Sequence, residues 1–317
     1  MSHRVRIVAL LAGCLLVAGC SKAPAPPGES GTATLEQAVY TTFYPTTWFT
    51  KRIAGDLVPV HCPLPPDEDA IFWQPARETI ERYQNAALVV INGAEFEKWA
   101  MTAPLARSRV VDTAAVVTEP FIEFKSFGHS HGAAGEHSHD GIDGHTWVDP
   151  VNAIAQAGVI RDALVRTWPE HEAAFAAGYS ALERDLSALK ARLDALNDGV
   201  DGGRSIHVFR IVASHPAFNY MGRRQGWDIH SFDFDPDSTM AGASIADIRR
   251  VLAEGDPTRP VILLWEGEPA DAVLEQIEDF GMKSVYFSPA ENVDEAAEGD
   301  YLEIMNANLD RLEAAMK

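Results

Sequence analysis

From Glu36 onward, short apolar runs alternate with amphipathic stretches in two parts of the chain. The runs are typical of buried strands, and the stretches between them have the spacing of helices. The predicted strands are residues 38–43, 57–61, 88–92 and 109–112, and later 205–213, 228–232, 260–265 and 284–287. The predicted helices are residues 46–54, 78–85, 217–225, 244–254, 271–280 and 301–316. This alternation predicts two mainly parallel sheets, each covered by helices on both faces.

The stretch between these two parts has a purely helical pattern. Its apolar residues step by four and three, at positions 175, 179, 182, 186, 189, 193 and 196. They predict one helix of roughly 25 residues, about 40 Å long, with Pro169 near its start and glycines after it. We therefore predict an α/β fold: two Rossmann-like βα lobes joined by a long backbone helix. A ligand cleft between the lobes follows, because such sheets bind ligands beyond the carboxyl ends of their strands.

The amino-terminal residues have the pattern of a targeting segment. Arg4 and Arg6 precede an apolar stretch at 7–17, and the sequence VAGC at 17–20 resembles the lipobox of bacterial lipoproteins. We expect a signal peptide at 1–19, lipid on Cys20 and a flexible tether over 20–35. The apolar stretch is shorter than the about 20 residues of a membrane span. The expected location is therefore extracytoplasmic, in the periplasm or at the cell surface, with the lipid as the only membrane contact.

The remaining domain boundaries follow the same patterns. An amino-terminal α/β lobe is expected at 36–150, linking helices with the long helix at 151–198, and a carboxy-terminal α/β lobe at 199–317. After processing, Cys62 is the single remaining thiol, so no disulfide can form within the mature chain.

Charge restricts the possible partners. The formal net charge is -20 and the isoelectric point is near 4.8. An acidic surface argues against nucleic acid and against an anionic membrane surface, and it favours cations.

A histidine-rich loop at 128–145 is the most distinctive local feature. It contains five of the eleven histidines among Ser, Gly, Asp and Glu, namely His129, His131, His137, His139 and His145. No apolar periodicity would pack these imidazoles into a core. The loop either collects metal or is simply solvated; an affinity tag would normally lie at a terminus.

Four stretches together carry a resemblance to a known family. They are TTFYP at 41–45, IAGD at 53–56 with Pro-Pro and Gln-Pro downstream, HTWVDP at 145–150, and SHPAFNY at 214–220. In order and spacing they resemble the solute-binding lipoproteins of ABC importers for zinc and manganese. The resemblance implies a monomeric receptor, not an enzyme, that captures a divalent transition metal for an ABC permease and its ATPase. Zinc is expected first, with Mn²⁺ or Fe²⁺ as alternatives.

The resemblance also implies two metal ligands, His145 and His215, each offering an imidazole of the kind that zinc binds. It leaves two gaps, since Ile71 stands where the family has a histidine and Ser288 stands where it often has an aspartate. Either an acidic run or a strand end could supply a carboxylate in place of these ligands, or the site has lost high-affinity binding. The candidates are Asp67, Glu68 and Asp69 in the run, and Glu266 and Glu268 after the predicted strand 260–265.

Two further functions are compatible with paired histidines. One is a zinc-dependent hydrolase with an open coordination position for water. The chain has neither a His-Glu-x-x-His helix nor a Gly-x-Ser-x-Gly turn, which disfavours it. The other is a metal buffer or chaperone that has no permease partner.

Overall fold

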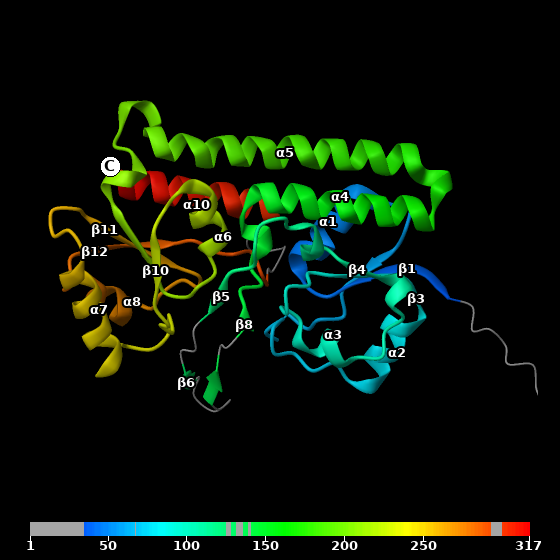
Figure 1. Ribbon diagram of the computed structural model, residues 1–317, viewed down its shortest axis with the longest axis horizontal. Helices are drawn as coiled ribbons and strands as arrows, with labels where there is room; N and C mark the ends of the chain where they lie inside the picture. Colours follow the sequence, from blue (N-terminus) through cyan, green and yellow to red (C-terminus); the bar gives the residue numbers. More distant parts are fainter. Residues whose placement is uncertain (1–34, 67, 125–127, 131–135, 139–140, 293–299) are drawn as a thin grey trace, which may run out of the picture. The chain divides into compact units, whose positions relative to one another are not determined.

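The computed structural model of the protein describes residues 35–317 except 67, 125–127, 131–135, 139–140 and 293–299 (Figure 1). The predicted signal peptide, Cys20 and nearly all of the tether lie outside the described residues, as do His131, His139 and Asp67. Two short strands, β6 (Gly128–Ser130) and β7 (Glu136–Ser138), pair antiparallel with His129 opposite His137. Of the loop 128–145, the structure thus describes the backbone of these two strands and residues 141–145.

The first half of the fold is built on a parallel four-stranded sheet in the order β2-β1-β3-β4. Its strands are β1 (Glu36–Thr41), β2 (Val60–His61), β3 (Ala86–Ile91) and β4 (Val110–Asp112). Its helices are α1 (Tyr44–Ala54), α2 (Arg77–Asn85) and α3 (Lys98–Thr102). Short 3-10 turns follow at Arg107–Arg109 and Ala114–Val116, and β5 (Glu123–Phe124) pairs with β8 (Gly141–Ile142).

The second half repeats this plan with a parallel sheet in the order β10-β9-β11-β12. Its strands are β9 (Arg210–Ala213), β10 (Ile229–Ser231), β11 (Val261–Trp265) and β12 (Met282–Tyr286). Its helices are α6 (Asn219–Gln225), α7 (Ala243–Glu254), α8 (Asp271–Glu278) and α10 (Tyr301–Met316). The α/β fold with two parallel sheets is thus confirmed.

Two predicted strands start too early, because in 57–61 only Val60–His61 form a strand and in 205–213 the strand begins at Arg210. Residues Ile206–Val208 form a 3-10 turn, and the Ser205 side chain caps this turn by accepting a hydrogen bond from the His207 amide. The apolar residues of this turn alternate with polar ones, which is also the pattern of a strand. The strand itself therefore begins only at Arg210.

The predicted long helix is α5 (Glu172–Asp198), with 27 residues. It follows α4 (Pro150–Thr167) and the 3-10 turn Pro169–His171, and a turn at Val200–Gly202 comes after it. As Figure 1 shows, α5 runs alongside α4 and packs on α1 from the first half and α10 from the second. Its buried face is Phe175, Leu182, Leu186, Leu189, Leu193 and Leu196, all from the predicted stripe.

A single apolar cluster continues from the first sheet through α5 to the second sheet. It includes Phe49, Trp147, Leu186, Phe218 and Tyr301, all buried. Shared burial of this kind holds the two halves to the same long helix. Over the described part of the chain, no helix combines the length and the apolar character needed to cross a membrane.

Two helix glycines provide a matched test of this packing. A Cβ at Gly178 of α5 would lie 2.6 Å from the Ile53 carbonyl oxygen of α1, whereas a Cβ at Gly158 of α4 meets nothing closer than 3.7 Å. Gly178→Ala should therefore destabilise the protein by about 1–3 kcal/mol, and Gly158→Ala should stabilise it by up to about 1 kcal/mol. Urea unfolding followed by circular dichroism measures both. Equal gains in stability would contradict the close approach of α1 and α5.

Candidate metal centre

Polar side chains gather at the carboxyl edge of the second sheet. His215 lies two residues after β9, Asp233 two residues after β10, and Glu266 directly after β11. Glu291 comes from the loop after β12, and His145 lies just before α4. Because parallel strands all end at the same edge, loops that are distant in sequence meet there.

The sequence around His145 folds into a fixed support for its ring. Asp149 caps α4 by accepting a hydrogen bond from the Val151 amide at 3.0 Å, and Pro150 occupies the first turn, where no amide is needed. Trp147 is buried and donates from Nε1 to the Pro289 carbonyl at 2.7 Å. The HTWVDP motif thus anchors the start of α4 and fixes the position of His145 directly before this helix.

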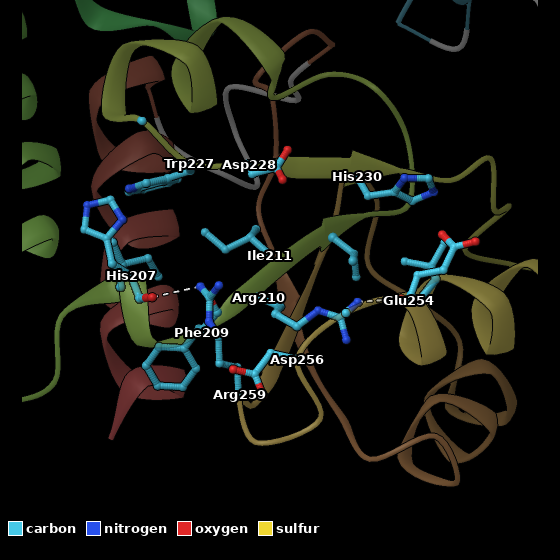
Figure 2. Close-up of a pocket in the computed structure, with 15 residues that line it drawn as sticks. His207, Phe209, Arg210, Ile211, Trp227, Asp228, His230, Glu254, Asp256 and Arg259 are labelled. Carbon is cyan, nitrogen blue, oxygen red and sulfur yellow. Dashed lines mark hydrogen bonds between the residues drawn. The ribbon is translucent and has the colours of Figure 1, made fainter.

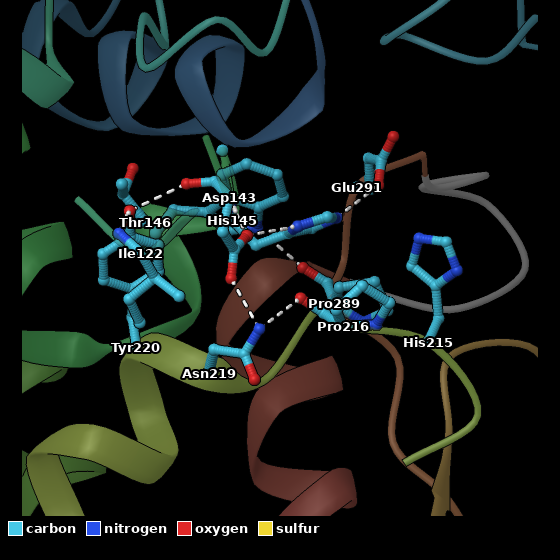
Figure 3. Close-up of polar contacts among 12 residues, drawn as sticks. Ile122, Asp143, His145, Thr146, His215, Pro216, Asn219, Tyr220, Pro289 and Glu291 are labelled. Carbon is cyan, nitrogen blue, oxygen red and sulfur yellow. Dashed lines mark hydrogen bonds and ion pairs between the residues drawn. The ribbon is translucent and has the colours of Figure 1, made fainter. Parts of the chain in front are cut away.

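The His145 ring is held by Asp143. Asp143 Oδ1 lies 2.8 Å from Nδ1 and also accepts from the His145 amide at 2.9 Å, while its Oδ2 accepts from Asn219 Nδ2 at 3.1 Å (Figure 3). Both residues are buried, with side-chain exposures of 4% and 0%. A carboxylate on Nδ1 fixes the tautomer and leaves Nε2 for an external partner. That nitrogen lies 3.5 Å from Glu291 Oε2.

His215 stands close to His145 on the opposite half of the fold. The two ring centroids are 6.3 Å apart. His215 Nδ1 is 3.6 Å from Glu266 Oε1 and 3.8 Å from Asp233 Oδ1. These separations are long for hydrogen bonds, but they are near the about 3.3 Å between two ligands that each lie about 2.0–2.1 Å from one tetrahedral zinc ion.

The two histidines and the carboxylates beside them do not yet converge on a single metal position. Within the described residues, no three His, Cys, Asp or Glu side chains are placed to hold an ion as they stand. Metal binding therefore requires His145 and His215, each with its neighbouring carboxylates, to move toward each other. Such a movement is small when the ring centroids already lie 6.3 Å apart.

The electrostatics of the centre favour a cation. Burial alone would lower the pKa of His145, but the hydrogen bonds and charges of Asp143 and Glu291 outweigh it and raise the pKa to about 10. Burial raises the pKa of Glu266 to about 8, and the charge of Glu291 adds to the effect. Partial burial also raises the pKa of Asp69, again with a contribution from Glu291. An excess of carboxylates in a poorly solvated place is therefore relieved by positive charge.

Of the predicted candidates, the structure brings His145, His215 and Glu266 together. Glu268 is exposed, and it is Glu266 and Asp233 that lie against His215. In an extended segment residues two apart face the same side, but the chain bends at residues 266–267 after β11 ends, and the two carboxylates part there. Our prediction of Glu268 as a ligand thus has no support in the geometry.

The acidic run lies at the rim of the centre. Glu68 is exposed, and its main-chain carbonyl accepts a hydrogen bond from Asn292 at 3.1 Å. The Asp69 carboxylate accepts from the amides of Ile71 and Phe72, so one of its oxygens is already in use. Neither carboxylate is in contact with a histidine, although the charge of His145 acts on Asp69.

Two residues of the centre, Asp233 and Glu291, were missed from sequence. Asp233 follows the predicted strand 228–232, so the strand-end rule that indicated Glu266 also applies to it. Glu291 is preceded by Ala290, whose backbone has φ 55°, a conformation that an alanine rarely adopts. No sequence signal predicts that turn.

A separate hollow of about 480 Å³ lies at the opposite, amino-terminal edge of the same sheet (Figure 2). Its guanidinium groups are engaged by main-chain carbonyls: Arg210 donates to Val251 and Leu252, and Arg259 donates to His207. The carboxyl edge, not this hollow, is where a parallel sheet binds its ligands.

The site contains two imidazoles among carboxylates, and the fold has two α/β halves joined by a long helix. Together these features define a metal-binding receptor. Residues 39–315 match the family of the zinc-uptake complex component A, periplasmic (ZnuA), and the chain belongs to this family. Its members are metal-binding components of uptake complexes and not enzymes. The family resemblance is confirmed, and the hydrolase alternative is set aside.

Individual relatives are more distant. The chain is 24% identical over 323 residues to the high-affinity zinc uptake system protein ZnuA of Bacillus subtilis, covering 97% of this chain and 96% of the relative. It is 26% identical over 285 residues to the zinc-binding lipoprotein AdcA of Streptococcus pneumoniae, covering 86% of this chain and 54% of AdcA. The chain thus spans about half the length of AdcA.

Solved structures agree in fold. The metal-dependent lipoprotein YcdH of Bacillus subtilis superimposes with a TM-score of 0.73 at 22% identity, covering 89% of this chain and 99% of YcdH. The manganese complex of FpvC from Pseudomonas aeruginosa gives 0.68 at 22% identity, covering 89% and 99%. At this level of identity the likeness concerns the fold alone.

Proposed function

We propose that this protein is the extracytoplasmic receptor of an ABC importer, which captures one divalent transition metal ion and delivers it to a membrane permease. The observation that supports this most directly is the pair His145 and His215, one from each half, with ring centroids 6.3 Å apart and carboxylates between them. Zinc binds such imidazole nitrogens readily. The membership in a zinc-uptake family points the same way.

Zinc is our first choice of ion, and manganese or iron the second. Imidazoles suit zinc, whereas carboxylates suit manganese. Relatives illustrate both: the ZnuA-like domain of AdcA from Streptococcus pneumoniae was solved with Zn(II), and FpvC with Mn²⁺ and with Ni²⁺. Because carboxylates lie near His145 and His215, the relative affinity for these ions has to be measured.

We propose that lipid on Cys20 anchors the protein after removal of residues 1–19, and that the loop 128–145 raises the local metal concentration. The lobes at 36–150 and 199–317 then close on the ion by a small movement, because α5 spans both. The partners are the permease and its ATPase.

The proposal is tested with the metal-free full-length protein. Zinc is titrated in competition with a chromophoric chelator, and one ion per chain with a submicromolar dissociation constant is expected. Transport of zinc is then followed in proteoliposomes that contain the permease encoded beside this protein. Tight binding without receptor-dependent transport would favour the metal buffer, and weak binding would argue against both functions.

A further inference from the structure

We propose that Asn92 is a positioning residue of the metal centre, which fixes the two residues that flank His145. It acts through the loop that carries the His145 ring. This inference rests on the proposed function, since it concerns how one ligand of that centre is held.

The side chain of Asn92 binds this loop on both sides of His145. Asn92 directly follows β3 and is fully buried, with an exposure of 0%. Its Nδ2 donates a hydrogen bond to the Gly144 carbonyl at 2.8 Å, and its Oδ1 accepts one from the Thr146 hydroxyl at 3.2 Å. Gly144 precedes His145 and Thr146 follows it. One amide group at the carboxyl edge of the first sheet therefore sets the place of the His145 main chain.

The hydrogen bonds of Asp143 and Asn92 serve different purposes. Asp143, which holds the ring and the amide of His145, lies only two positions earlier in the same loop (Figure 3). Such a bond orients the imidazole within the loop and moves together with it. Asn92 comes from the end of β3, 52 positions before Gly144. It therefore connects the ring that Asp143 orients to the edge of the first sheet.

Asn92 is itself held rigidly. Its amide donates to Glu97 Oε1 at 2.7 Å, and its carbonyl accepts from the Ala114 amide at 2.7 Å. The Thr113 hydroxyl donates to the same carbonyl at 3.1 Å. Gln156 of α4 donates to Asn92 Oδ1 at 3.0 Å and to Thr113 Oγ1 at 2.9 Å. A side chain with its donors and acceptors engaged in this way transmits the position of the sheet to the loop that it binds.

The turn after Asn92 is strained, and a buried carboxylate maintains it. Gly93, Ala94 and Glu95 take φ of 84°, 50° and 59°, a region that residues other than glycine rarely adopt. The Glu97 carboxylate, 2% exposed, accepts from the amides of Asn92 at 2.7 Å and Gly93 at 3.2 Å. Backbone strain persists where the surroundings impose it, and such positions cluster at functional sites. This turn therefore supports a role for Asn92 beyond that of an ordinary strand end.

Asn92→Asp tests this role with the smallest change in shape. It keeps the acceptor for Thr146 and replaces the donor by an oxygen that faces the carbonyls of Gly144 and Gly93. These carbonyls then lose their partner in a buried place, which is costly and displaces the loop. We expect the zinc affinity, measured by chelator competition, to fall about 10–100-fold. The visible absorption of the Co²⁺-loaded protein should change as well, because the His145 ring meets the ion in a different geometry.

Asn197→Asp is the matched control. Asn197, near the end of α5, also bridges two side chains, since Nδ2 donates to Gln225 at 2.8 Å and Oδ1 accepts from Trp227 Nε1 at 2.7 Å. Both substitutions should lower the melting temperature of the metal-free protein, but Asn197→Asp should keep the zinc affinity and the Co²⁺ spectrum of wild type. A third variant, Thr146→Val, removes the hydroxyl that donates to Asn92. It should lower the affinity by at most about tenfold and change the spectrum in the same sense.

The outcomes separate this inference from the function it rests on. Wild-type affinity in folded Asn92→Asp overturns it, and so does an equal loss of affinity in Asn197→Asp. A lower affinity with an unchanged Co²⁺ spectrum also overturns it, because Asn92 would then contribute stability alone. If metal-free Asn92→Asp does not fold, Thr146→Val decides: a lower affinity with a changed spectrum supports the inference, and wild-type values overturn it.

His145→Ala tests the proposed function separately. If this variant binds zinc like wild type, the proposed centre itself is wrong. If it binds weakly while Asn92→Asp binds normally, the centre stands and the positioning role of Asn92 is wrong.

Discussion

Replacing either His145 or His215 by alanine is expected to lower the zinc affinity by at least about 100-fold. Loss of a residue that merely supports a ligand costs about 10–100-fold, and loss of a ligand itself should cost more. Each substitution removes one of the two imidazoles and leaves its carboxylate partners, Glu291 or Glu266 and Asp233, without a shared ion. Competition with a chelator of known affinity measures both dissociation constants.

His207→Ala is the matched control. This histidine is exposed and belongs to the same half of the fold as His215, but it lies in the turn before β9, at the opposite edge of the sheet (Figure 2). Its zinc affinity should equal that of wild type. If the His145 and His215 variants bind normally and only deletion of the loop 128–139 weakens binding, the centre around these two histidines is not the functional site.

Contacts between the halves indicate how far the centre can move. Asn219, at the start of α6, donates to the Asp143 that holds His145, and Arg224 of the same helix pairs with Asp149 at 2.9 Å and with Glu119 at 2.7 Å. The two histidine loops are therefore already tied together without metal. Closing a gap between preformed pairs needs less rearrangement than assembling four separate ligands, which favours tight binding.

The fold was accessible from sequence because its elements follow simple periodicities. The strands β3 and β11 are continuous buried apolar runs, as expected for parallel sheets covered on both faces, and the stripe of α5 is the period of one helix. The 3-10 turn Ile206–Val208 was not accessible, because three residues of alternating character fit a strand equally well. Local capping by Ser205, not the apolar pattern, decides that segment.

The sequence predicts a residue of the metal centre only where that residue lies next to a regular helix or strand. His215, Glu266 and Asp233 all follow strands, and topology alone brings them to one edge. Glu291 depends on the left-handed turn at Ala290 and on contacts with Pro66 and Glu68, more than 200 positions away. The choice between Glu266 and Glu268 depends on how the chain bends at residues 266–267, and composition does not encode that.

Zinc affinity is expected to rise steeply with pH. In the metal-free protein the pKa of His145 is about 10 and that of Glu266 about 8, so at pH 7 both hold a proton that a metal ion must displace. Below pH 8, zinc binding should release about two protons, so the affinity should rise about 100-fold per pH unit. Between pH 8 and 10, binding should release one proton, so the affinity should rise about tenfold per pH unit. Calorimetry at pH 7 in buffers of different ionisation enthalpy counts the protons released.

Glu266→Gln is the control for this proton count, because it should remove one released proton and leave the contribution of His145.

The pH dependence of folding stability gives an independent check that both pKa values are raised. Both groups bind protons more tightly in the folded protein than their ordinary pKa values allow, so the stability of the metal-free protein should fall as pH rises, through 4.5–8 for Glu266 and 6.5–10 for His145. Zinc reverses this trend, because it binds the deprotonated forms, so the rise in melting temperature on adding zinc should grow from pH 6 to pH 8. A constant rise over that range would mean that neither group is protonated in the metal-free protein.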